Sequence, residues 1–267
     1  MTTTALSSPR GPAARLGSFV GHDLLRQLKM AESVFFIAVL PTALFLMFGT
    51  LSDWGSLQAG HGNVVAYTMV SMALYGAVTA TTSISGSAAV ERQLGWGRQL
   101  SLTALSGMSY LVGKATVAVC VAVLPVALVY AVGALTGAEM DSVWRWAASA
   151  GLTLLAAVPF AFYGLAAALL FRSEAAVSAA SGLLVVFGFF GNLFMPLNGV
   201  LLEIARFTPL YGSGLLARWP MMEGQSVTTD GTLVTEPLWA VLLSIGAWTL
   251  LFLTICLLAN RRRTSRA

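Results

Sequence analysis

The stretch of sequence that decides the fold is VVAYTMVSMALYGAVTATTSI, residues 64–84. It is predominantly apolar and carries no charged side chain. A helix that crosses a membrane needs roughly 20 predominantly apolar residues to span about 30 Å of hydrocarbon. Residues 64–84 therefore predict a membrane-spanning helix.

Five further stretches have similar length and apolar character. They are residues 33–51, 110–135, 146–171, 175–195 and 238–259. Charged residues lie only near their edges, where the Lys114 and Arg172 side chains are expected to reach the lipid headgroups. The sequence thus predicts an all-α integral membrane protein with six transmembrane helices.

Three of these stretches contain an interior proline, namely Pro41, Pro125 and Pro159. Proline lacks a backbone N–H and its ring crowds the preceding turn of a helix. In a membrane bundle, neighbouring helices can satisfy the carbonyls that are freed in this way. The three prolines are therefore expected to kink their helices without ending them.

The composition excludes an ordinary soluble domain. Of the 267 residues, 57% are hydrophobic and 10% are charged, whereas soluble domains average about 25% charged residues. The length suits one membrane domain, residues 33–259, between an N-terminal segment, residues 1–32, and a basic tail, residues 260–267. The net charge of +4 comes from residues between apolar runs and near the ends, which fits membrane topology rather than nucleic-acid binding.

The distribution of basic residues predicts the orientation. If the N-terminus is cytoplasmic, all of the 15 Lys and Arg residues except Arg145, Arg206 and Arg218 fall on the cytoplasmic side. Loops that stay in the cytoplasm carry an excess of Lys and Arg. We therefore expect a multi-pass protein of the cytoplasmic membrane, with both termini in the cytoplasm.

The segment before the first predicted span has the pattern of an amphipathic helix. Its apolar residues recur at helical spacing, at Leu16, Phe19, Val20, Leu24 and Leu28. Its basic residues fall on the other side, at Arg15, His22, Arg26 and Lys29. This pattern favours a helix in the inner headgroup layer, although a solvated segment that leads into the first span would also fit.

The cytoplasmic loop at residues 87–109 combines charged and large apolar side chains. Its central part reads Glu91-Arg92-Gln93-Leu94-Gly95-Trp96-Gly97-Arg98-Gln99-Leu100. A linker does not need this much apolar surface, so the loop is predicted to dock another protein. The alternative is that Trp96 only anchors the loop at the membrane interface.

The segment at residues 196–236 is expected to enter the outer leaflet without crossing the membrane. Residues 200–207 and 210–219 are apolar but too short to span, and Pro209 lies between them. They are interpreted as two short re-entrant helices, followed by an exposed polar loop at residues 225–236.

The sequence contains no recognisable metal-binding, catalytic or phosphate-binding motif. The two histidines and two cysteines lack metal-ligand spacing, and no catalytic motif is present. Residues 107–115 fail as a phosphate-binding loop, because five residues separate the glycines and Ala115 follows Lys114. No ionisable residue lies in the middle of a predicted span, which argues against an ion-coupled transporter or a channel. The chain is therefore not expected to be an enzyme or to bind a cofactor.

Two motifs in these segments resemble a known family. After the second span the chain has Glu91-Arg92 followed by Gly95, Leu102 and Thr103, and the fifth span ends on Phe194-Met195-Pro196, with Phe207-Thr208-Pro209-Leu210-Tyr211 further on. In order and placement these resemble the membrane subunits of ABC type-2 exporters, which include antibiotic-resistance and polysaccharide-export permeases. Trp96 and Ala104 depart from the family pattern, which more often has Thr and Pro there.

The resemblance implies a transport complex. Two permease subunits, identical or different, would assemble with two ABC ATPase subunits that bind ATP and Mg²⁺. The loop from Glu91 to Leu100 would be the coupling helix that the ATPase receives, and the amphipathic segment would lie along the membrane lipid. The coupling residues would be Glu91, Arg92 and Arg98 for polar contacts, Leu94, Trp96 and Leu100 for the buried anchor, with Gln93 and Gly95 between them.

The apolar interior suggests an amphipathic or hydrophobic small substrate, such as a drug, an antibiotic or a lipid-like molecule. Two alternatives to an ATP-driven exporter are an ion-coupled secondary transporter and a non-transporting membrane subunit with an immunity or sensor role.

Overall fold

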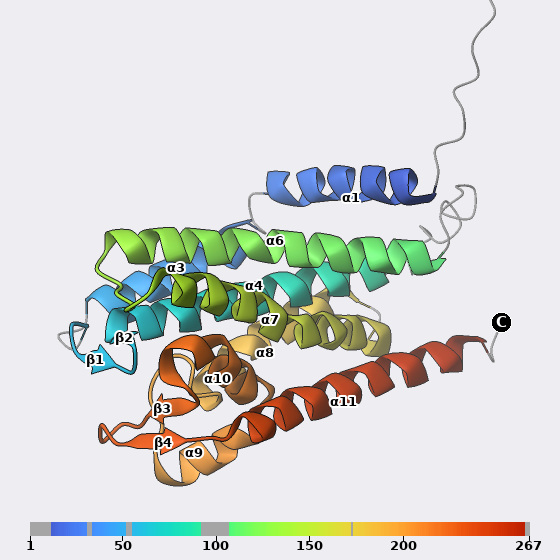
Figure 1. The fold of residues 1–267 in the computed structure, drawn as a ribbon. Coiled ribbons are helices and arrows are strands. Elements are labelled where there is room, and N and C mark those ends of the chain that lie inside the picture. The colour runs from blue at the N-terminus through green and yellow to red at the C-terminus, as the bar shows by residue number, and fades with distance from the viewer. Residues whose placement is uncertain (1–11, 31–33, 52–54, 92–106, 172, 265–267) are drawn as a thin grey trace, which may run out of the picture.

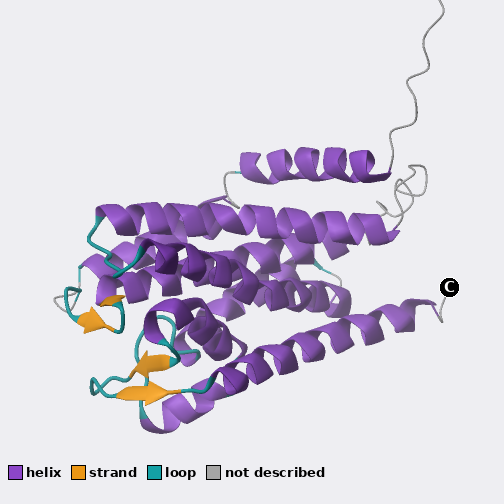
Figure 2. Cartoon of the chain, in the orientation of Figure 1, coloured by secondary structure: helices purple, strands orange, loops and turns teal. Residues whose placement is uncertain are grey.

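The computed structural model describes residues 12–30, 34–51, 55–91, 107–171 and 173–264. The described chain is helical apart from two short antiparallel hairpins, β1–β2 and β3–β4 (Figure 2). The elements before the first long helix are α1 (Pro12–Lys29), η1 (Phe35–Val39), α3 (Leu40–Phe45), η2 (Leu46–Thr50), β1 (Gln58–Ala59) and β2 (Gly62–Asn63). The long helices are α4 (Val64–Glu91), α6 (Gly107–Leu135), α7 (Val143–Phe171), α8 (Glu174–Phe190) and α11 (Leu238–Thr264). Between α8 and α11 lie α9 (Gly199–Arg206), α10 (Pro209–Met222), β3 (Gln225–Val227) and β4 (Leu233–Thr235).

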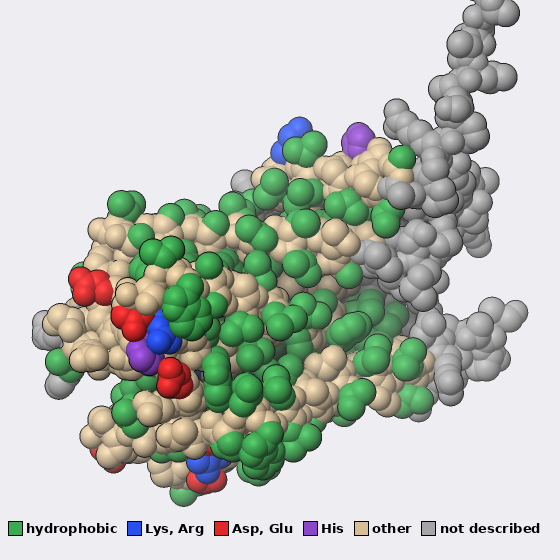
Figure 3. All heavy atoms as spheres, in the orientation of Figure 1, with side chains coloured by type: hydrophobic (Ala, Val, Ile, Leu, Met, Phe, Trp, Pro, Cys, Tyr) green, Lys and Arg blue, Asp and Glu red, His purple; other side chains and the backbone are tan. Residues whose placement is uncertain are grey.

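The molecule has two distinct ends. Both hairpins, α9 and α10 lie at one of them, which we call the hairpin end (Figure 1). The C-terminus of α4 lies toward the opposite end, which we call the Glu91 end. On the face in Figure 3, apolar side chains cover the middle of the molecule, while charged side chains gather at the hairpin end and on α1. A broad apolar surface next to a charged end is compatible with a protein that lies in a bilayer.

The structure bears out the all-helical prediction, and the six predicted spans only in part. Among the described residues, four helices are long and apolar enough to cross a membrane: Val64–Ala88, Gly113–Leu135, Val143–Phe171 and Leu238–Ala259. The other two predicted spans, residues 33–51 and 175–195, contain the shorter apolar helices Phe35–Thr50 and Glu174–Phe190. At 1.5 Å per residue, a 17-residue helix covers about 26 Å, which is less than a typical hydrocarbon core.

Local signals at both ends explain why α8 is shorter than predicted. The Ser173 side chain caps its start by accepting a hydrogen bond from the Ala176 backbone N–H at 3.2 Å. After Phe190 the chain turns back, with Asn192 in the left-handed region at φ 55° and the Leu193 N–H bonded to the Gly188 carbonyl. Residues 191–195, which were predicted to end the span, form this turn instead.

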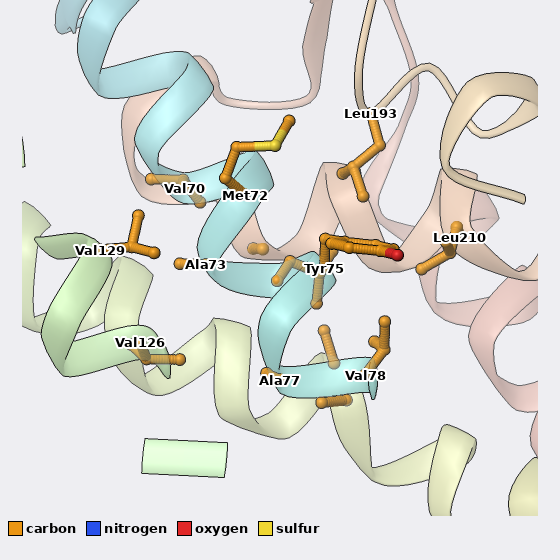
Figure 4. Packing of buried hydrophobic residues seen from close by; sticks show 14 of the residues in the cluster. Val70, Met72, Ala73, Tyr75, Ala77, Val78, Val126, Val129, Leu193 and Leu210 are labelled. Atoms are coloured by element: carbon orange, nitrogen blue, oxygen red, sulfur yellow. The ribbon is translucent and has the colours of Figure 1, made fainter. Parts of the chain in front are cut away.

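The helix α4 lies at the centre of the bundle and is buried along almost its whole length. Figure 4 shows side chains of α4 packed between α6 and the turn after α8. The labelled residues from α4 are Val70, Met72, Ala73, Tyr75, Ala77 and Val78. Their neighbours in the core include Val126 and Val129 of α6 and Leu193 and Leu210 near the hairpin end.

Several buried Ser and Thr hydroxyl groups on α4 donate hydrogen bonds to backbone carbonyls. Ser71 and Thr79 each donate to the carbonyl four residues earlier, at 2.9 and 2.8 Å. Thr81 and Thr82 also donate to carbonyls of α7, those of Ala157 and Phe160, at 3.1 and 3.3 Å. These bonds join two helices inside an apolar core, where an unpaired hydroxyl would be costly.

Glycines allow the helices to approach α4 closely. A Cβ on Gly164 of α7 would overlap the Thr82 carbonyl of α4. Gly76 of α4 lies against two of the predicted kink prolines, because a Cβ there would meet Pro125 at 2.6 Å and Pro41 at 3.1 Å. Such contacts between small residues are typical of helix packing in membranes.

The chain continues in helical form through all three prolines. Pro125 and Pro159 lie inside α6 and α7, as predicted. Around Pro41 the helix contains π-helical turns, η1 before α3 and η2 after it. Wider turns of this kind accommodate a break in the regular hydrogen-bond pattern.

Replacing Gly164 with alanine is expected to destabilise the protein. The new methyl group would collide with the α4 backbone, which cannot move aside as a flexible side chain can, at a cost of about 1–3 kcal/mol. The matched control is Gly151→Ala in the same helix, where a Cβ meets nothing within 4 Å. Melting temperatures in detergent should fall for Gly164→Ala and stay unchanged or rise slightly for Gly151→Ala. Equal melting temperatures would contradict the close α4–α7 contact.

Candidate functional site

The helix α1 packs against the first part of α6 (Figure 1). Leu16 and Phe19 lie on Gly113, where a Cβ would come within 2.7 Å of the Phe19 ring. Val20 and Leu24 contact the hydrophobic core next to them. The amphipathic pattern therefore corresponds to a helix whose apolar stripe faces the bundle.

Four charged residues connect α1 to the two helices that flank residues 92–106. We call Asp23, Arg26, Glu91 and Lys114 the Glu91 cluster. Lys114 Nζ of α6 lies 2.9 Å from Asp23 Oδ2 and 2.8 Å from Glu91 Oε2. Arg26 Nη2 of α1 lies 2.8 Å from Asp23 Oδ1 and 2.5 Å from Glu91 Oε1. Each cation thus bridges both carboxylates.

The Glu91 cluster is electrically balanced and largely removed from solvent. The Lys114 and Asp23 side chains are 3% and 7% exposed, while that of Arg26 is 46% exposed. Burial by itself would raise the pKa of Glu91, but hydrogen bonds from Lys114 and Arg26, together with their charges, hold it below its ordinary value of 4.5. Burial opposes the charge of Arg26 too, yet Glu91 and Asp23 raise the pKa of its guanidinium.

These contacts differ from the sequence predictions for Lys114 and for the face of α1. Lys114 was expected to reach the headgroups, but it is buried and paired with the carboxylates of Asp23 and Glu91. Asp23 and Gln27 are buried on the side of α1 that faces the bundle, whereas Leu28 is 41% exposed. No apolar pattern marks Asp23, whose place depends on a partner 91 residues away in the sequence.

The structure locates some of the predicted coupling and interfacial residues. Glu91 ends α4 and is engaged in the Glu91 cluster, and Arg26 belongs to it as well. Phe19 and Leu24 contact the bundle, and Lys29 is exposed. The rest of the predicted coupling loop, namely Arg92, Gln93, Leu94, Gly95, Trp96, Arg98 and Leu100, lies outside the described residues, as does the side chain of Arg15. Their predicted roles stay predictions.

The predicted re-entrant segment forms two short helices, α9 and α10. Pro209 occupies the first turn of α10, and Tyr211 of the same helix donates a hydrogen bond to Glu236 Oε1 at 3.2 Å. Arg206 of α9 reaches the same carboxylate at 2.7 Å. Pro196 lies exposed in the turn before α9. The two helices agree with the prediction, and their depth in a membrane stays a prediction.

A second polar network joins three segments at the hairpin end. His61, between β1 and β2, contacts Asp141 Oδ2 at 2.9 Å and Glu223 Oε1 at 3.0 Å through its two ring nitrogens. Arg145 of α7 contacts Asp141 at 2.7 Å and bonds to the Pro220 carbonyl. The loops at this end are therefore held to one another and to α10, which sequence spacing could not show.

Within the described residues, no three His, Cys, Asp or Glu side chains are grouped as a metal site requires. A scan of the chain against models of protein families gives no match, and a comparison with curated proteins gives none either. The geometry of the Glu91 cluster is therefore the basis for its interpretation.

Removing the Lys114 charge is expected to destabilise the protein. Lys114→Met would leave Asp23 and Glu91 close together without one of their shared cationic partners, and breaking a buried ion pair typically costs about 3–5 kcal/mol. Lys29→Met is the matched control, because Lys29 is exposed on α1. Melting temperature in detergent should fall only for Lys114→Met. A similar fall for both variants would show that the cluster does not hold α1.

The stabilisation from Glu91 is expected to depend on pH. Because the folded-state pKa lies below 4.5, its contribution is complete above pH 4.5 and is lost as the pH falls through that lower pKa. Glu91→Gln should therefore be less stable than the wild type at pH 7, and the difference should shrink in acid. A constant difference between the two melting temperatures from pH 7 to pH 3 would contradict this assignment.

Proposed function

We propose that this chain is the permease subunit of an ATP-driven ABC exporter in the cytoplasmic membrane. In this proposal the helices Phe35–Thr50 and Glu174–Phe190 cross together with the four longer ones, which gives six spans with both termini in the cytoplasm. The start of α1 and the end of α11 lie at the same end of the molecule, which supports an even number of crossings (Figure 1). A second permease subunit and two ATPase subunits, which bind ATP and Mg²⁺, would complete the complex.

The observation that carries the proposal is the Glu91 cluster. It connects α1 to the last residue of α4 and to the first turns of α6, and those two helices flank the predicted coupling loop. A protein that pushes on the loop therefore moves α1, α4 and α6 together, because separating them would expose unpaired buried charges. Since α4 is the central helix, this displacement reaches α7 through the Gly164–Thr82 contact.

The geometry modifies the role that we propose for Glu91. Its carboxylate already has two cationic partners within α1 and α6, so it serves to position the loop rather than to contact the ATPase. Contact with the ATPase then falls to the residues that follow, with Trp96, Leu94 and Leu100 as the buried anchor. Arg92 and Arg98 supply the charged contacts around that anchor.

The described spans favour an external energy source over ion coupling. None of the four long apolar helices has an Asp or Glu within its candidate span. Ion-coupled transporters normally carry such groups in the membrane, because coupling needs a charge that can be neutralised there. The apolar surface and core support an amphipathic or hydrophobic substrate.

Trp96→Ala is expected to weaken association with the ATPase subunit that we expect to be encoded beside this gene. A buried Trp at an interface typically contributes 2 kcal/mol or more, so affinity should fall by roughly 30-fold or more. The control is Trp239→Ala at the start of α11, where Trp239 is 69% exposed at the hairpin end. Affinity is measured with both subunits purified in detergent. Unchanged binding of Trp96→Ala would refute the loop as the docking segment.

Transport in cells separates the proposed exporter from an ion-coupled transporter. Efflux of an amphipathic dye should stop when ATP is depleted and should continue when an uncoupler dissipates the ion gradient while ATP is maintained. The opposite pattern would identify an ion-coupled transporter. Efflux that is identical with and without the chain would favour a non-transporting subunit.

A further inference from the structure

The helix α10 carries a fully buried arginine, Arg218, which is 0% exposed. Its Nη1 donates to Ser71 Oγ of α4 at 2.7 Å, and its guanidinium lies 4.3 Å from the centre of the Tyr67 ring. Its Nη2 lies 3.5 Å from the Asn192 carbonyl in the turn after α8. The distribution of basic residues predicts Arg218 on the outer side, and the apolar stretch around it is the sequence signal of its burial.

Arg218 lacks a counter-ion in the part of the chain that the structure describes, where no Asp or Glu lies within ion-pair distance of it. The other buried cation, Lys114, has two carboxylate partners. A buried charge is normally paired, because an ion loses its hydration when it leaves water. Ser71 and the Tyr67 ring offset part of this loss, yet they leave the positive charge unbalanced.

Arg218 and two residues in contact with it, Tyr67 and Asn192, each have a buried polar atom with no hydrogen-bond partner among the described residues. These atoms are Arg218 Nε, Asn192 Nδ2 and the Tyr67 hydroxyl. The orientation of the Asn192 amide follows from its oxygen, which accepts a hydrogen bond from the Leu197 N–H at 2.9 Å. All three atoms can donate a hydrogen bond, so the partner that would satisfy them is an acceptor. Together with the unbalanced charge, this indicates an anion.

We propose that Tyr67, Asn192 and Arg218 bind the oxyanion group, a carboxylate or a phosphate, of the transported molecule. Transport of this molecule and control of the site by an ATPase rest on the proposed function, whereas the anion site itself follows from the buried donors. A carboxylate or phosphate has several acceptor oxygens, which suits a guanidinium and two neutral donors at once. Leu193, which lies with the guanidinium against Gly214, is apolar and buried, so the rest of the ligand is hydrophobic.

The site is closed in this structure, since Arg218 has no exposed surface. Space for the guanidinium depends on Gly214, where a Cβ would lie 3.2 Å from Arg218 Nη2 and 3.3 Å from Leu193. The anion reaches Arg218 when α10 and the turn with Asn192 separate from α4. Movement of α4 under ATPase control would open and close this site.

The test measures equilibrium binding of ³²P-labelled dodecyl phosphate to the full chain, purified in dodecyl maltoside without an ATPase. Wild-type protein should bind the probe with saturation, and unlabelled dodecanol, which has the same chain without the charge, should not displace it. Displacement by inorganic phosphate would support a site for a free anion. Saturable binding that inorganic phosphate does not displace would support a site for an anionic amphiphile.

Tyr67→Phe is the decisive variant, because it keeps the ring under the guanidinium and removes only the unpaired hydroxyl. The dissociation constant of dodecyl phosphate should rise about tenfold, as expected for the loss of a hydrogen bond to an anion. The melting temperature without probe should stay unchanged, since the hydroxyl has no hydrogen-bond partner among the residues that the structure describes. Arg218→Gln should abolish binding.

Tyr130→Phe is the matched control on α6, where the hydroxyl is hydrogen-bonded to Ser149 Oγ at 2.9 Å. It should lower the melting temperature and leave probe binding intact. The proposal is overturned if the wild type does not bind dodecyl phosphate, if dodecanol displaces it, or if Tyr67→Phe and Arg218→Gln bind it as the wild type does. These results stand whether or not the chain couples to an ATPase.

Discussion

The contact between Gly164 of α7 and the Thr82 carbonyl of α4 is the constraint on which the rest of the structure depends. It brings two helix backbones together, so that Thr81 and Thr82 can donate to α7 carbonyls. Close approach and shared hydrogen bonds of this kind are what hold helices together in lipid, where the hydrophobic effect between helices is weak. With α4 fixed at the centre, its two ends define the two polar regions of the molecule.

The two polar regions differ in how the charge of a buried cation is balanced. At the Glu91 end, Lys114 lies between the carboxylates of Asp23 and Glu91, and the resulting cluster holds α1 against the bundle. Toward the hairpin end, the described residues give Arg218 neutral hydrogen-bond partners and leave its Nε unpaired. A satisfied ion network stabilises one arrangement of the helices, whereas an unsatisfied one favours a partner from outside the chain. Both contact α4, so a single helix links the proposed ATPase-facing region to the proposed anion site.

Much of the helical pattern could be predicted from the sequence, because long apolar stretches have few alternatives to a helix in lipid. Residues 64–84 and three similar stretches form helices of spanning length. The same pattern placed Phe19 and Leu24 on the apolar side of α1. The apolar pattern predicted too long a helix at residues 175–195. Hydropathy does not reveal the left-handed turn at Asn192, and α8 ends just before that turn. The pattern also could not separate the proposed docking role of Trp96 from a membrane anchor.

The sequence by itself determined that the chain is helical, that its helices are apolar enough for a membrane, and that charged residues lie outside the candidate spans or near their edges. Only the tertiary structure decided which charged residues are paired. Asp23 meets Lys114 across 91 residues of sequence, and Arg218 meets Ser71 across 147. Periodicity describes one helix at a time, whereas the energy of a buried charge depends on the atoms that other helices bring to it. Glu91 and Arg218 are both charged residues beside or within apolar stretches. The fold gives Glu91 two cationic partners, and among the described residues it gives Arg218 no counter-ion.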